Sequence, residues 1–232
     1  MGNVIRIGIG DLKLTKNERQ MLYSLVDSDM FSEGRHMKEF EEKWASWVGT
    51  RHCVAFNSGT SAMMAGFVAL QHSSKYKDRV KKGSKVITTP LTYIATVNSV
   101  VTAGLEPVFV DVGEDFNIDV EKVAEHLENA DDANQYSVLL PVHLLGYVVD
   151  MDKINAIARK YDLVVFEDAA EAHGSTYKGK RVGSMSTLSD FSFYMAHAVA
   201  AGELGTLNTN DTELRTLVES LKFNGRACCC TV

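Results

Sequence analysis

The turn in FNSGTSAMMAG is the first segment whose residue types could do chemistry. An apolar run ends at Asn57, and Gly59, Thr60 and Ser61 open a helical pattern directly after it. The free N–H groups and the dipole of a helix start favour an anion, so this turn is a candidate phosphate cradle. Ser and Thr are also preferred as helix caps, so a plain structural cap is the alternative.

Two acidic residues, Glu167 and Asp168, close the apolar run of VVFEDAAEAHG. Burying a carboxylate is costly unless a cation or a hydrogen-bond donor meets it. A protonated ring nitrogen of a cofactor, an arginine or a helix N-terminus would be such a partner, and an Asp that caps the next turn is the alternative. Glu171, three residues after Asp168, lies on the same side if that turn is helical.

A single imidazole stands in the loop of FSFYMAHAVAAGELG. Ser192 alternates with Phe191 and Phe193, so in a strand its hydroxyl points away from both rings and could serve an anion site. His197 follows five residues later among Met, Ala, Val and Gly. An imidazole moves protons near neutral pH, although a lone His beside apolar residues is more often a satisfied structural residue.

Short β-branched runs alternate with helical patterns and must position these segments. The expected strands are CVAFN, KVITT, PVFVDV, SVLLPV and LVVFED, and stretches such as SAMMAGFVALQH and DMDKINAIARKYD are expected as helices. This alternation predicts an α/β fold, and the nearly continuous apolar strands predict a mostly parallel sheet covered by helices on both faces. Ligands in such sheets collect at the carboxyl ends of the strands. Residues 14–49 predict two further helices split by SEGRH.

Composition excludes some partners. The chain has 232 residues, 45% of them hydrophobic, which suits one domain or a domain plus a fragment. A net charge of −6 gives no basic field for nucleic acid, and no apolar run approaches the roughly 20 residues of a membrane span. The start lacks the apolar core of a signal peptide, so we expect a cytoplasmic chain with reduced cysteines. Cys228, Cys229 and Cys230 alone do not make a credible metal cluster, and no metal site is predicted.

Four segments resemble the DegT/StrS sugar aminotransferase family in order and spacing. They are NSGTSAMMAGFVAL, VITTPLTYIATVNSVVTAGLEPVFVDV, PVHLLGYVVDMDKI and VVFEDAAEAHGSTYKGKRVGSMSTLSDFSFY, and the resemblance runs from about Ile5 to Arg226. It implies a three-layer large domain of fold type I, with a mostly parallel mixed sheet flanked by helices, that binds pyridoxal 5′-phosphate or pyridoxamine 5′-phosphate. It also implies an N-terminal helical segment over residues 1–30, the large domain over 31–232, and a missing smaller C-terminal domain, so the chain looks truncated.

The resemblance implies a role for each site residue. Asp168 would pair with the pyridinium nitrogen, Tyr93 would stack on the pyridine ring, and Glu171 would lie near the phenolic oxygen of the cofactor. His143 matches a recurring histidine at the edge of the active site, where it would bind substrate; a satisfied structural His is the alternative. The residues expected to bind the cofactor phosphate are Gly59, Thr60 and Ser192.

His197 occupies the position of the family's Schiff-base lysine, and no lysine occurs from Val182 through Leu221. An imidazole cannot form that covalent link, so lysine-based transamination is not expected. The loop is similar to that of the 3-dehydratases of CDP- or GDP-4-keto-6-deoxyhexoses, which keep a His there. The resemblance therefore implies a homodimer that removes the C3 hydroxyl of a nucleotide-linked keto-sugar, with pyridoxamine phosphate as cofactor and His197 as base.

Two other functions stay open at this point: an aminotransferase homologue with a substituted lysine, and a non-catalytic module that retains cofactor or sugar binding. The family's GEGG is GELG here, so Leu204 puts a side chain where a close backbone approach is expected. Leu204 and the stop at Val232 favour the non-catalytic module, whereas His197 favours the dehydratase.

Overall fold

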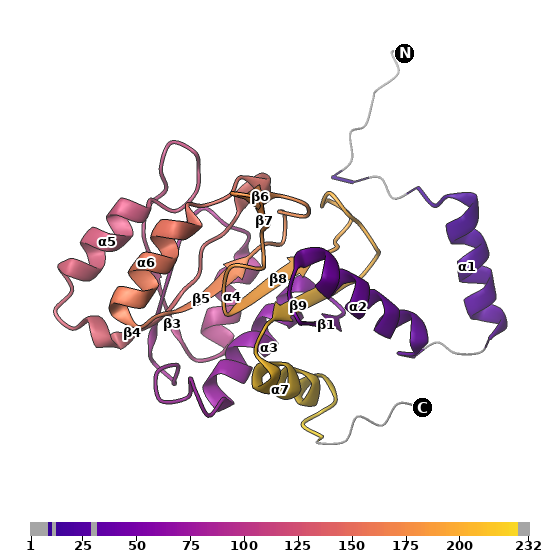
Figure 1. The fold of residues 1–232 in the computed structure, drawn as a ribbon, viewed down its shortest axis with the longest axis horizontal. Helices are drawn as coiled ribbons and strands as arrows, with labels where there is room; N and C mark the ends of the chain where they lie inside the picture. Colours follow the sequence, from indigo (N-terminus) through magenta and orange to yellow (C-terminus); the bar gives the residue numbers. More distant parts are fainter. Residues whose placement is uncertain (1–8, 11–12, 29–31, 227–232) are drawn as a thin grey trace, which may run out of the picture.

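A seven-stranded sheet forms the centre of the molecule in the computed structural model, which describes residues 9–10, 13–28 and 32–226 (Figure 1). In spatial order the strands are β1 (His52–Phe56), β9 (Gly205–Thr209), β8 (Leu188–Ser192), β5 (Val164–Asp168), β4 (Tyr136–Leu139), β2 (Lys85–Thr88) and β3 (Glu106–Phe109). Neighbouring strands are parallel except that β9 runs antiparallel to both β1 and β8. The predicted α/β class with a mostly parallel mixed sheet is confirmed.

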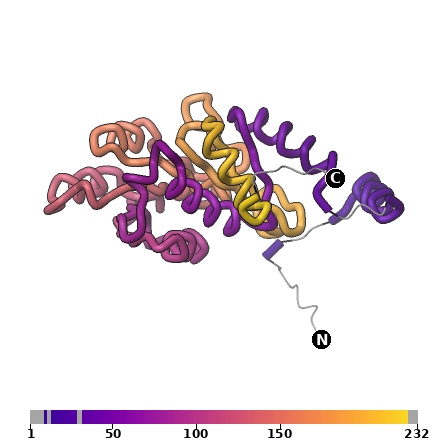
Figure 2. Tube along the Cα trace, turned by 90° about the horizontal axis from the view of Figure 1, so that it is seen from below, coloured from indigo at the N-terminus to yellow at the C-terminus, as the bar shows by residue number. Residues whose placement is uncertain are grey.

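Helices cover both faces of this sheet. The α-helices of the described part of the chain are α1 (Lys16–Asp27), α2 (Arg35–Val48), α3 (Gly59–His72), α4 (Ile94–Thr102), α5 (Val120–Glu128), α6 (Met151–Tyr161) and α7 (Thr212–Lys222). Helices α3, α4 and α7 share one core cluster with the sheet, while α5 and α6, and separately α2, pack in clusters of their own. Helix α1 lies to one side of this layered body in both views (Figures 1 and 2).

Strand β5 divides its side chains between the two faces. Phe166 packs in the cluster with α3 and α7, and Val165 packs in the cluster with α5 and α6. Because side chains alternate along a strand, Asp168 takes the side of Phe166 and Glu167 takes the side of Val165. The alternation therefore sends the two acidic residues to opposite faces of the sheet.

Strand β8 shows the same alternation. Leu188 packs with α3 and α7, whereas Phe191 packs edge-on against Trp44 of α2, with ring centroids 5.2 Å apart. Phe193, just beyond the strand, packs against the same Trp44 at 4.9 Å. The predicted orientation of Ser192, away from both Phe rings, follows from this pattern.

Element boundaries differ little from the prediction. Helix α2 begins at Arg35, inside the expected break SEGRH, because the extended Gly34 serves as its N-cap. The predicted N-terminal segment 1–30 contains α1, while residues 1–8, 11–12 and 29–31 lie outside the described residues, as do Cys228, Cys229 and Cys230. Within the described ranges, each helix is too short or too polar to cross a membrane.

Gly205, the first residue of β9, packs directly against the backbone of Ser58 and Gly59. It pairs with Phe56 and Ser192, and a Cβ added to it would lie 2.1 Å from the backbone carbon of Ser58. Since backbone cannot yield as a flexible side chain does, Gly205→Ala should lower the free energy of unfolding by about 1–3 kcal/mol in urea denaturation. The matched control is Gly113→Ala, whose Cβ would come no closer than 3.3 Å to the side chain of Asp115 and 4.0 Å to the Asn117 carbonyl oxygen. Equal losses in the two variants would contradict this account of the packing.

Candidate active site

Two predicted phosphate ligands, Gly59 and Ser192, lie against each other at the carboxyl ends of β1 and β8. A Cβ added to Gly59 would sit 2.8 Å from the Cβ of Ser192, so only a glycine leaves this space free. Ser58 caps α3 by accepting the Ser61 N–H at 3.1 Å, so the structural cap exists. Among the described residues the amides of Gly59 and Thr60 have no acceptor, which leaves both N–H groups available to an anion.

Asp168 is a buried carboxyl group at the end of β5, with 5% of its surface exposed. One oxygen accepts the hydroxyl of Thr96 at 2.7 Å, and the other accepts the backbone N–H of Ala170 at 3.2 Å. Burial, and then the neighbouring charge of Glu171, raise its pKa above the ordinary value against these two hydrogen bonds. Within the described ranges no Lys or Arg pairs with it, so the site holds a carboxyl group ready for a cation.

Thr96 is a site residue that sequence reasoning missed. It stands in the first turn of α4, and its hydroxyl also contacts the hydroxyl of Thr92 at 2.7 Å. The signal was a threonine three residues after Tyr93, on a helix that begins at the carboxyl end of β2. Tyr93 itself is the N-cap of α4 and is 76% exposed, so its ring is accessible and its stacking role stays a prediction.

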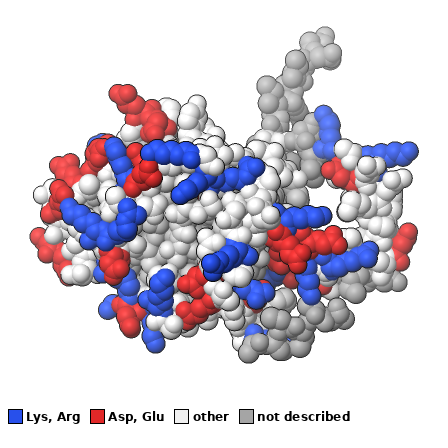
Figure 3. Space-filling model, viewed as in Figure 1, with Lys and Arg blue, Asp and Glu red and all other residues white. Residues whose placement is uncertain are grey.

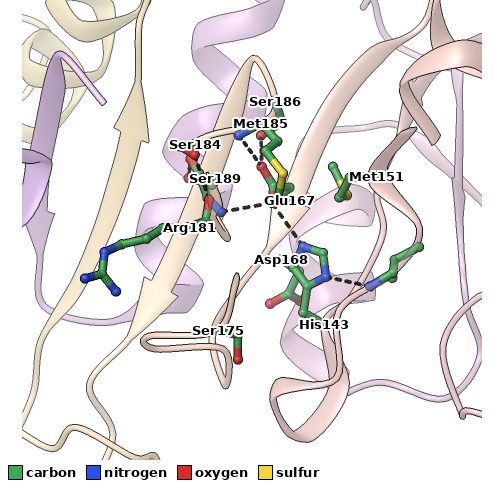
Figure 4. A network of polar contacts seen from close by, with 12 residues as sticks. His143, Met151, Glu167, Asp168, Ser175, Arg181, Ser184, Met185, Ser186 and Ser189 are labelled. Atoms are coloured by element: carbon green, nitrogen blue, oxygen red, sulfur yellow. Dashed lines mark hydrogen bonds and ion pairs between the residues drawn. The ribbon is translucent and has the colours of Figure 1, made fainter. Parts of the chain in front are cut away.

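Glu167 and His143 form a buried network on the other face of the sheet (Figure 4). The Glu167 carboxylate accepts hydrogen bonds from the Gly183 N–H at 2.9 Å, from the Ser186 hydroxyl at 2.7 Å and from Nε2 of His143 at 3.1 Å. Burial alone would raise the pKa of Glu167, but these hydrogen bonds lower it below its ordinary value. The carboxylate therefore stays ionised and ties the turn at residues 183–186 to β5.

His143 is buried, and both of its ring nitrogens are bonded. Val149 donates its N–H to Nδ1 at 3.3 Å, so Nε2 carries the proton that is donated to Glu167. The backbone N–H of His143 also donates to the carbonyl of Asp168 at 3.0 Å. These contacts favour the alternative of a satisfied structural histidine, and a role in substrate binding stays a prediction.

Glu171 joins the loops that follow β4 and β5. Its carboxylate accepts the backbone N–H of Leu145 at 2.7 Å, and nearby Ser175 donates its hydroxyl to the carbonyl of Gly146 at 2.8 Å. The charge of Glu171 contributes to the raised pKa of Asp168, and the predicted placement of both acids on one side of the site stays a prediction. The residues between them form a turn and not the helix on which that placement was conditioned. Its contact with a cofactor stays a prediction.

His197 lies half-buried in the loop after β8, close to the same two acids. Burial lowers the pKa of its imidazole, and the charges of Glu171 and Asp168 oppose this shift. The imidazole therefore has a large neutral fraction near pH 7, which is the form that accepts a proton. The rings of Tyr194 and His173 flank it, with centroids 6.0 and 6.2 Å away.

Leu204 does not lie where the sequence led us to expect. Its side chain is partly buried against the aromatic cluster that contains Trp44 and Phe193, and its carbonyl accepts the Phe193 N–H at 2.9 Å. The close backbone approach falls one residue later, at Gly205 against Ser58. The structure thus corrects the expected obstruction, because the glycine that the cradle requires is present.

Two surface hollows, of about 620 and 490 Å³, lie away from these residues. The first is lined by Lys85 and Tyr136, which begin β2 and β4, and the second by Leu163 and Thr187, which precede β5 and β8. Both are therefore at the amino ends of strands, whereas the predicted site residues lie at the carboxyl ends. Neither hollow is lined by a predicted site residue.

Known proteins share this architecture. GDP-perosamine synthase of Caulobacter vibrioides is 37% identical over 227 residues, which cover 97% of this chain and 58% of that protein. The Helicobacter pylori aminotransferase PseC, involved in the biosynthesis of pseudoaminic acid, superposes with a TM-score of 0.83 at 26% identity, over 93% of this chain and 55% of that chain. Escherichia coli GDP-4-keto-6-deoxy-D-mannose-3-dehydratase with bound hydrated PLP superposes with a TM-score of 0.85 at 28% identity, over 94% of this chain and 54% of that chain.

This chain spans little more than half the length of these relatives. The aminotransferase and the dehydratase superpose on this chain with similar TM-scores. The fold therefore does not distinguish the two reactions, which depend on the residues of the site. The sequence profile of the DegT/DnrJ/EryC1/StrS aminotransferase family matches residues 12–229. The chain is a member of the DegT/DnrJ/EryC1/StrS aminotransferase family.

Proposed function

We propose that this chain is the cofactor-binding part of a nucleotide-sugar 3-dehydratase that uses pyridoxamine phosphate, with His197 as an untethered base. The observation that carries the proposal is an imidazole where the family resemblance expects a lysine, within electrostatic reach of Asp168 and Glu171. No lysine between Val182 and Leu221 could take over the covalent role.

The residues of the site fit the cofactor. The amides of Gly59 and Thr60, which find no acceptor among the described residues, would offer donors to a phosphate group beside Ser192. Asp168 lacks a cation among the described residues, and a protonated pyridine nitrogen would supply one. Without a covalent link, the cradle, Asp168 and the ring of Tyr93 would hold the cofactor together.

When bound, pyridoxamine phosphate supplies an amine that condenses with the sugar C4 ketone and a ring that accepts an electron pair. His197 would accept a proton from the C4′ carbon of the cofactor, and its lowered pKa favours the neutral imidazole that this role needs. The same imidazole would then give this proton to the C3 hydroxyl, which would leave as water when the C3–O bond breaks. Thr96 and the Ala170 N–H hold the Asp168 carboxylate in place, where it would pair with the ring nitrogen of the bound cofactor.

The substrate of this proposal is a nucleotide-linked keto-sugar, and the assembly is a cytoplasmic homodimer. Exposed apolar side chains on α1 support a second copy as partner, because the described part of the chain buries no residue of α1. They are Met21, Leu22, Tyr23, Leu25 and Val26. An apolar helix face of this kind is typical of a protein interface.

The His197→Asn variant separates base catalysis from cofactor binding. Asn keeps the approximate size of the side chain but cannot accept the proton, so exchange of the C4′ hydrogens of pyridoxamine phosphate with deuterated solvent should slow by roughly 10²–10⁴-fold. Cofactor affinity, measured by fluorescence titration, should stay close to that of the parent chain. The control is His36→Asn, which changes an exposed histidine on α2. Unchanged exchange in His197→Asn would dismiss His197 as the base.

The His197→Lys variant tests whether residue 197 faces the reacting carbon. A lysine amine there should bind pyridoxal phosphate covalently, giving a new absorption band and an adduct that borohydride makes permanent. Partial burial assists because it favours the deprotonated amine that reacts. The parent chain should bind pyridoxal phosphate without any such adduct within residues 182–221. If His197→Lys binds the cofactor but forms no adduct, residue 197 does not face C4′.

A further inference from the structure

Asp190 is a second buried carboxyl group in the floor of the candidate site. It stands in β8, is 1% exposed, and is the register partner of Asp168 in β5. Paired residues of adjacent strands share a face, and such strands lie about 4.8 Å apart. Both carboxyl groups therefore face α3 and α4 side by side.

The surroundings of Asp190 supply no counter-charge. Its Oδ1 atom has no hydrogen-bond partner among the described residues. Helix α4 and strand β9 contain no ionisable side chain, and α3 contains only His72, at its far end. Asp168 is therefore the charged group that acts on Asp190, and its charge makes Asp190 harder to ionise, so ionising both carboxyl groups takes a higher pH than ionising one.

Asp190 also lies beside the phosphate cradle. Ser192 is two residues further along β8 on the same face, about 7 Å away by the rise of a strand. Ser192 in turn abuts Gly59 at the start of α3. Asp190 thus sits between Asp168, which would meet the pyridine nitrogen, and the cradle that would bind the phosphate.

We propose that Asp190 makes the binding of a phosphate-bearing cofactor proton-dependent: the protonated carboxyl group admits the phosphate beside Ser192, and the ionised carboxylate repels it. The inference rests on the cofactor site proposed above. Burial, and then the charge of Asp168, hold the pKa of Asp190 well above its ordinary value. The admitting form is therefore present at lower pH and is lost as pH rises through that raised pKa.

The test compares the chain with its Asp190→Asn variant, which stays neutral and nearly isosteric at every pH. The dissociation constant of pyridoxamine phosphate is measured by fluorescence titration from pH 5.5 to 9. The ratio of the two constants cancels the titration of the ligand, which is common to both proteins. This ratio, parent over variant, should be near one at the acidic end and rise roughly tenfold at the alkaline end.

Pyridoxamine without the phosphate is the matched ligand. It carries no phosphate for Asp190 to repel, so the ratio of its dissociation constants, parent over variant, should stay constant or fall as pH rises. Parallel pH profiles of parent and variant for pyridoxamine phosphate overturn the proposal. Absence of binding in both proteins overturns it together with the cofactor site, which distinguishes that failure from a failure of Asp190 alone.

Stability of the cofactor-free chain gives a second readout. Because the folded state holds the Asp190 proton more tightly than the unfolded state, stability is highest below the unfolded pKa of about 3.9 and falls as pH rises through the folded pKa. The unfolding constant of the parent should thus rise up to tenfold more per pH unit than that of Asp190→Asn. The control Asp131→Asn, at an exposed position, should leave the parent's slope unchanged. If the unfolding constants of the parent and of Asp190→Asn change equally with pH, the folded chain does not hold a proton on Asp190.

Discussion

A buried carboxyl group with hydrogen-bond donors but no cation is the constraint on which the rest of this site depends. Asp168 takes its position from the parallel pairing of β5 with β4 and β8, and its orientation from Thr96 and Ala170. On the face shown in Figure 3, basic and acidic side chains are intermixed. In the proposed function a cationic ring nitrogen of the cofactor would pair with Asp168, the phosphate cradle would hold the same cofactor, and His197 would act on it.

Sequence patterns predicted most of this architecture because the strands that carry the site are apolar on both faces. Runs such as CVAFN and LVVFED are typical of buried parallel strands, and the residues after them mark the carboxyl edge where ligands bind. The alternation of Ser192 with Phe191 and Phe193 predicted the side of β8 on which the Ser192 hydroxyl lies. The two Phe rings pack in the aromatic cluster on the opposite side of the strand. The positions of Gly59, Asp168 and Ser192 follow from these local signals.

Contacts between distant segments could not be predicted in the same way. Strand β9, with the sequence GTLNT, lacks an apolar run and becomes a strand because β1 and β8 pair with it on both sides. The role of Gly205 depends on its approach to Ser58, and the role of Thr96 depends on where α4 meets β5. The sequence shows Asp190 only as an acidic residue next to a predicted strand. That it lies beside Asp168 depends on the register of β5 and β8, which the sequence does not reveal.

The central claim is that His197 faces the reacting carbon of a cofactor held without a covalent bond. A crystal structure of the chain with pyridoxamine phosphate bound tests this most directly. The account predicts a ring nitrogen of His197 within about 3–3.5 Å of C4′, the pyridine nitrogen paired with Asp168, and the phosphate at Gly59, Thr60 and Ser192. A cofactor bound elsewhere, or an imidazole turned away from C4′ while the cofactor occupies the cradle, would contradict it.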